Sequence, residues 1–126
     1  MENFCEITFC QQIGSNKRHN QDALFNGEAV FQYKLKTAEK RLENRPHFIV
    51  GEADGISNSN RPEKASKLAM QLLSQMESIS RQTIYDLQSS LSAELAEDYF
   101  GSATTFVAAE IDQITRKAKI LSVGDS

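Results

Sequence analysis

The chain has little cysteine, and this limits the ways in which it can be held together. Cys5 and Cys10 are its only cysteines. Five positions apart on an expected strand, they would point to opposite faces and lie too far apart for a disulfide. We therefore expect buried free thiols in a reducing cytoplasm, and we prefer this interpretation to a metal-binding pair.

Long apolar runs and clusters of positive charge are also absent. No apolar run approaches the length that spans a bilayer, and no basic segment followed by an apolar one begins the chain. We therefore expect neither a secretory signal nor a membrane partner. The net charge is −3 and no basic block is present, so we do not expect binding to nucleic acid.

The remaining composition is typical of one globular domain. The chain has 126 residues, of which 40% are apolar and 25% are charged. No repeat or linker divides it, so we treat residues 1–126 as one domain. Its first part predicts, in order, a strand over 3–13 that ends at Gly14, a polar loop over 14–22, a hairpin over 23–35, a solvated loop or short exposed helix over 37–46, and a strand over 47–53.

Two adjacent helices are expected next, because apolar residues recur at steps of three and four. The first has Pro62 in its first turn, with Asn60 or Arg61 as its cap. Met70 lies off its expected buried stripe, which consists of Ala65, Leu68, Ala69, Leu72, Leu73, Met76 and Ile79. The second spans 83–99, is capped by Ser80 or Thr83 and is followed by Gly101.

The last part of the chain returns to strand. Residues 103–111 and 118–123 are rich in β-favouring or alternating residues, and a polar turn over 112–117 separates them, so we expect a hairpin. Strands, then two consecutive helices, then strands indicate an α+β fold in which the helices pack on an antiparallel sheet.

The strand over 47–53 runs into Asp54 and Gly55, and this dipeptide has two interpretations. Asp-Gly is a common turn sequence, and a simple turn is the plainer one. The alternative is a cation site, because a carboxylate and a backbone carbonyl are oxygen ligands that Mg²⁺ or Mn²⁺ prefer.

Acidic residues at other strand ends favour the cation site. Asp22 and Asp125 also stand beside apolar strands, and all of these carboxylates can face one cleft. Carboxylates that converge on one point repel one another unless a cation lies among them. Such cations would activate water and hold a phosphate, which Lys17 or Arg18 could contact.

Four stretches, in their order and spacing, resemble the metal-dependent serine/threonine protein phosphatases of type 2C, the PPM-type family. They are residues 17–22, residues 48–55 followed by Ala65-Ser66, residues 101–105 and residues 121–126. The family fold is a layered α-β-β-α sandwich of antiparallel sheets with paired flanking helices. The resemblance implies that residues 1–126 are the N-terminal half of such a domain, truncated at the Gly-Asp-Ser motif.

The resemblance also implies roles for single residues. Asp54 would bridge two Mg²⁺ or Mn²⁺ ions, and the Gly55 carbonyl would bind one of them. Gln21 and Asp22 would contact the second ion, mainly through water, and Asp125 would help to hold a third, weaker ion. The implied activity is that of a cytoplasmic protein phosphatase, which hydrolyses phosphoserine or phosphothreonine in proteins. In this reaction a metal-bridging hydroxide would attack phosphorus directly.

Several positions depart from the family pattern. Lys17 stands where the family has a phosphate-binding Arg and lacks its bidentate geometry, unless Arg18 takes over. Gln21 replaces a common Glu, and Ile56 replaces the His general acid of animal members. We interpret His19 as a surface loop residue in preference to a catalytic acid.

The largest departure is length, because the family has two further metal-binding Asp residues beyond the Gly-Asp-Ser motif. Asp86, Asp98 and Asp112 do not replace them, since we expect two on or at the end of a helix and one in a turn. One alternative is therefore a catalytically inactive, phosphatase-like module that binds a partner. Another is a small-molecule phosphoester hydrolase on the same scaffold.

Overall fold

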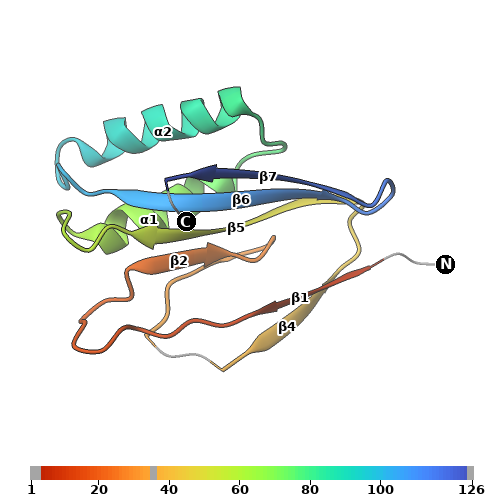
Figure 1. Cartoon of the computed structure of the whole chain (residues 1–126), viewed down its shortest axis with the longest axis horizontal. Helices are drawn as coiled ribbons and strands as arrows, with labels where there is room; N and C mark the ends of the chain where they lie inside the picture. Colours follow the sequence, from red (N-terminus) through yellow and green to blue (C-terminus); the bar gives the residue numbers. More distant parts are fainter. Residues whose placement is uncertain (1–3, 35–36, 125–126) are drawn as a thin grey trace.

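The computed structural model describes residues 4–34 and 37–124 of the chain. It is an α+β fold with antiparallel sheets and two helices (Figure 1). The elements are β1 (Cys5–Phe9), β2 (Asp22–Phe25), β3 (Val30–Phe31), β4 (Glu39–Glu43), β5 (His47–Gly55), α1 (Pro62–Leu73), α2 (Arg81–Leu95), β6 (Thr104–Asp112) and β7 (Lys117–Val123).

The strands form a large sheet of order β3-β2-β5-β6-β7 and a small sheet of β1 and β4, and neighbouring strands are antiparallel throughout. Both helices lie on one face of the large sheet, and the small sheet lies on the other side (Figure 1). The predicted hairpins are confirmed as β2–β3 and β6–β7. Asn26 closes the first, because its side-chain oxygen accepts hydrogen bonds from the backbone N–H groups of Glu28 and Ala29.

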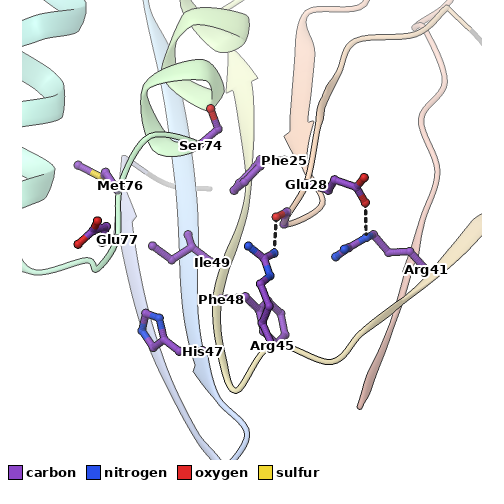
Figure 2. A pocket seen from close by; sticks show the side chains of 11 residues that line it. Phe25, Glu28, Arg41, Arg45, His47, Phe48, Ile49, Ser74, Met76 and Glu77 are labelled. Atoms are coloured by element: carbon purple, nitrogen blue, oxygen red, sulfur yellow. Dashed lines mark hydrogen bonds and ion pairs between the residues drawn. The ribbon is translucent and has the colours of Figure 1, made fainter. Parts of the chain in front are cut away.

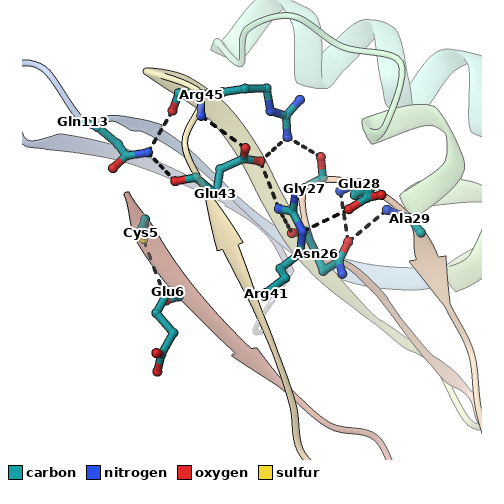
Figure 3. Close-up of polar contacts among 10 residues, drawn as sticks. All are labelled: Cys5, Glu6, Asn26, Gly27, Glu28, Ala29, Arg41, Glu43, Arg45 and Gln113. Carbon is teal, nitrogen blue, oxygen red and sulfur yellow. Dashed lines mark hydrogen bonds and ion pairs between the residues drawn. The ribbon is translucent and has the colours of Figure 1, made fainter. Parts of the chain in front are cut away.

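The prediction of a loop or exposed helix over 37–46 is wrong, because residues 39–43 form β4. Figure 3 shows what compensates the charges of this segment. The carboxylate of Glu43 is buried and accepts hydrogen bonds from the side chains of Arg41 and Arg45. The side chain of Gln113, from the β6–β7 turn, donates to the backbone carbonyl of Glu43 at 2.9 Å and thereby links the small sheet to the large one.

Both helices are confirmed with different bounds: α1 ends at Leu73, before Met76 and Ile79 of the predicted stripe, and α2 begins and ends earlier than the predicted 83–99. Arg61 precedes α1 with a φ of 47° and without a side-chain cap, so only its position was predicted correctly. Ser80 caps α2 in a reciprocal capping box: its side chain accepts from the Thr83 backbone N–H, and the Thr83 side chain accepts from the Ser80 N–H.

The core lies between the helices and the large sheet, and it includes a residue that we placed outside it. Met70 is fully buried, so its exclusion from the buried stripe was wrong. The buried side of α1 is wider than one stripe because the helix packs against β2, β5, β6 and α2. Gly51 leaves room for this contact, since a Cβ there would lie 2.5 Å from the Leu73 side chain and 3.5 Å from the Met70 sulfur.

Cys5 and Cys10 are free thiols, but the prediction that they are buried is wrong. Cys5 is half-buried and Cys10 is exposed, because β1 pairs only with β4 and is not enclosed within the core. Over the described residues, no helix is both long and apolar enough to cross a membrane.

Met70 provides a test of the core. We expect Met70→Ala to lower the free energy of unfolding by about 2–5 kcal/mol, because it removes a fully buried side chain and leaves a cavity. The neighbouring exposed residue supplies the control, and Gln71→Ala should change the same quantity by less than about 0.5 kcal/mol. Equal effects in urea unfolding would contradict the described core.

Candidate functional site

The candidate site lies at one end of the large sheet. β5 and β7 end there, and β2 and β6 begin there, on the left in Figure 1. The register places Asp22 directly opposite Asp54 on neighbouring strands, and Thr105 opposite Asp54 on its other side. Residues that are distant in the sequence are therefore brought together by strand pairing alone.

The alternation of side chains along β5 sets the face on which the carboxylates lie. Ala53 is buried beneath the helices, so its neighbours Glu52 and Asp54 point to the opposite face. Asp22 pairs with Asp54 and therefore shares this face. Asp22, Glu52 and Asp54 are all exposed. They lie on the helix-free face of the large sheet, next to its half-buried apolar residues.

The proximity of these carboxylates perturbs the titration of Asp22. Removal of its carboxyl from water raises the pKa of Asp22 to about 6, although the residue as a whole is exposed. A hydrogen bond with the Asp54 carboxyl and the negative charges of Asp54 and Glu52 raise the pKa in the same direction. Close approach of the two aspartates is therefore unfavourable when both are charged, and a bound cation would relieve it.

Gly55 and Gln21 are tied together next to this pair. The backbone N–H of Gly55 donates to the backbone carbonyl of Gln21 at 2.9 Å. A Cβ at position 55 would lie 2.6 Å from the carbonyl oxygen of Pro62 and 2.7 Å from that of Gln21, so only glycine fits without displacing backbone. The side-chain oxygen of Gln21 accepts a hydrogen bond from the Ser57 hydroxyl at 2.9 Å. Whether the Gly55 carbonyl or the Gln21 amide contacts a cation stays a prediction.

The predicted phosphate-binding residues lie in the loop before β2. Lys17 and Arg18 are exposed, and no ion pair joins either of them to an acidic residue in the described part of the chain. His19 is also exposed. Burial raises the pKa of Glu63 at the start of α1, but hydrogen bonds, first of all from Arg61, outweigh it and lower that pKa. The role of Lys17 or Arg18 in binding phosphate stays a prediction.

Asp125 lies outside the described residues, so its predicted place beside Asp54 is not visible. Gly124, the last described residue, has a φ of 88° and packs against Thr105, the cross-strand partner of Asp54.

Glu52 belongs to the acidic group, yet the sequence interpretation missed it. The available signal was its position two residues before Asp54 on the same strand, because side chains two positions apart along a strand point to the same face of the sheet. Within residues 4–34 and 37–124, no group of three or more His, Cys, Asp or Glu side chains is arranged to hold a metal ion.

A cavity of about 680 Å³ opens at the opposite end of the large sheet, and Figure 2 shows the residues that line it. Its two arginines are engaged in the fold. The guanidinium of Arg45 donates to the Gly27 carbonyl at 2.6 Å, and that of Arg41 donates to Glu28 at 3.2 Å. Hydrogen bonds, first of all from Arg45, lower the pKa of Glu43 to about 2. We therefore interpret these arginines as structural, and we place the candidate site at Asp22 and Asp54.

Comparisons of the chain with protein-family models, with curated proteins and with solved structures gave no match.

The raised pKa of Asp22 predicts a pH dependence of stability in metal-free protein. Between about pH 4 and pH 6, folded Asp22 holds a proton that the unfolded chain releases, so its contribution to stability is lost as the pH rises through this window. Asp22→Asn removes this loss. We expect its Tm, relative to the original chain, to increase as the pH is raised from 4 to 7.

Thermal unfolding followed by circular dichroism with a chelator present measures this difference. Asp98→Asn is the matched control, since Asp98 is an exposed residue beyond the end of α2. A Tm difference for Asp22→Asn that is flat with pH, as expected for the control, would contradict the close carboxylate pair.

Proposed function

We propose that the chain is part of a metal-dependent phosphatase that hydrolyses phosphoserine or phosphothreonine in proteins. The observation that carries the proposal is the pairing of Asp22 with Asp54 on neighbouring strands of the large sheet. Asp54 and Asp22 would hold Mg²⁺ or Mn²⁺ through carboxylate oxygens, which are the ligands that these hard cations prefer. The bound cations would supply an activated water and a site for the phosphate oxygens.

The protein's own residues would then bind and orient the substrate. The exposed Lys17 and Arg18 lie in the loop that leads to Asp22 and would pair with the negative phosphate. Ser57 would hold the Gln21 amide in place through their hydrogen bond. Gly55 would allow the first turn of α1 to approach the site closely, which fixes the end of β5 relative to the loop before β2.

The finer architecture belongs to the same proposal. We propose that the two helices and the large sheet form half of an α-β-β-α sandwich, as the PPM-type resemblance implies, and that residues 1–126 are the N-terminal part of that domain. The half-buried apolar residues on the helix-free face of the large sheet support this, since a second layer would cover them; they include Leu24, Val50 and Val107. A reducing cytoplasm is proposed on the basis of the two free cysteines.

A catalytically inactive module that binds a partner is the second candidate function. The observation that favours it is the absence, among the described residues, of a group of three or more side chains arranged to hold a metal ion. Calorimetric titration with Mn²⁺ separates the two candidates. Binding that is lost in Asp54→Ala supports the enzyme, whereas an absence of Mn²⁺ binding by the intact chain supports the inactive module.

We expect residues 1–126 alone to be incomplete for catalysis, so activity is tested in the complete domain, by release of phosphate from a phosphoserine peptide with Mn²⁺ or Mg²⁺. We expect Asp54→Ala to lower the rate by at least about 100-fold, because it removes the proposed principal ligand. Asp112→Ala is the control, since this acidic residue lies at the opposite end of β6, and its rate should change by less than about twofold. Full activity in Asp54→Ala would contradict the proposal. A parallel measurement with small phosphomonoesters distinguishes a small-molecule hydrolase, which would prefer them to the peptide.

A further inference from the structure

The outer seam between the two helices contains a groove whose α1 side carries positive charge. The groove has a volume of about 300 Å³. Lys64 and Lys67 line it from α1, and Leu68 and Leu95 supply apolar surface from the two helices. Glu94, on α2, is the acidic residue of the lining.

The positive groups beside this groove differ in how far they are already engaged. The guanidinium carbon of Arg61 lies 5.8 Å from the centre of the Tyr99 ring, and the ammonium of Lys64 lies 5.4 Å from the same point. Arg61 also forms an ion pair of 2.6 Å with Glu63, which satisfies much of its charge. No ion pair joins Lys64 or Lys67 to an acidic residue within the described ranges. Neither ammonium group is neutralised by an ion pair in the described part of the chain, and the Tyr99 ring leaves the charge of Lys64 in place, so both can pair with a partner's carboxylates.

Hydrogen bonds fix the segment after α2, which contributes Tyr99 to the groove. The side chain of Asn60 donates to the Phe100 carbonyl at 3.0 Å, and the Ser102 hydroxyl donates to the Arg61 carbonyl at 2.8 Å. The loop that follows Asp54 is thereby fixed to the segment that follows α2. Tyr99 lies in that segment and lines the groove beside Lys64. An aromatic ring beside lysines is typical of a surface that binds a mixed acidic and apolar segment.

We propose that this groove docks an acidic, partly apolar peptide segment, in which carboxylates pair with Lys64 and Lys67 and an apolar side chain contacts Leu68 and Tyr99. The identity of that segment as part of the phosphorylated substrate rests on the proposed function. A peptide fits better than a nucleic acid, because Glu94 in the groove would repel a continuous phosphate backbone. A peptide can place an uncharged residue at that point.

The experiment measures binding without catalysis. An unphosphorylated fluorescent peptide of glutamate and phenylalanine is titrated with the intact chain and followed by anisotropy, next to the same peptide with lysine in place of glutamate. We expect the acidic peptide alone to bind, with an affinity that falls as salt rises. Combined Lys64→Ala and Lys67→Ala should weaken binding by roughly fivefold or more, since each removes one exposed charge pair.

The matched control removes two positive charges elsewhere. Lys40 in β4 and Lys117 in β7 are exposed, and their combined substitution by Ala should change the affinity by less than about twofold. Circular dichroism establishes that both double variants are folded. Equal weakening in the two double variants, equal binding of both peptides, no binding of the acidic peptide, or equally tight binding of a single-stranded oligonucleotide would each overturn the proposed groove.

The same proteins separate this proposal from the proposed function. A complete domain that binds the acidic peptide in the groove but releases no phosphate from a phosphopeptide contradicts the phosphatase alone. Phosphate release that is insensitive to acidic flanking residues, together with unchanged peptide binding in the Lys64 and Lys67 variant, contradicts the groove alone.

Discussion

The antiparallel pairing of β2 with β5 is the constraint on which the rest of the account depends. One register places Asp22 opposite Asp54 and Ala23 opposite Ala53. Because successive side chains point to opposite faces, the same pairing buries the two alanines beneath the helices and turns the two carboxylates to the other side. A shift of one residue would bury an aspartate in the core, so burial of the small residues fixes the geometry of the acidic pair.

Small residues under α1 make this register possible. Gly51 leaves space for Leu73 and Met70, and Gly55 lets the first turn of the helix lie against the end of β5. The side of β5 that faces the helices therefore packs closely. The opposite side carries Asp54 and Glu52, and there loss of hydration, followed by the effect of these two carboxylates, raises the pKa of Asp22 to about 6. Close packing on one face of the strand thus offsets an electrostatic cost on the other.

The sequence allowed much of the fold to be predicted, for reasons that differ between elements. The helices and hairpins have local signals, such as the periodic apolar residues of α1 and the Asn26 turn. β4 was missed because its charges suggested solvent exposure. Glu43 is instead buried and paired with Arg41 and Arg45, and the strand is held by distant partners, through pairing with β1 and a hydrogen bond from Gln113. Met70 was misplaced for a similar reason, since contacts of α1 with two layers widen its buried face.

The candidate site was predictable only in part. Asp22 and Asp54 were identified from motifs, but their direct opposition depends on strand register, which no local pattern specifies. Glu52 could have been predicted from the alternation of side chains along β5.

Cation binding by the Asp22 and Asp54 pair is tested most directly by an NMR titration with paramagnetic Mn²⁺ at substoichiometric concentration. The account predicts that amide signals around Asp22 and Asp54 broaden first, and that Asp54→Ala abolishes this broadening. Broadening centred on other residues, or unchanged in Asp54→Ala, would contradict it.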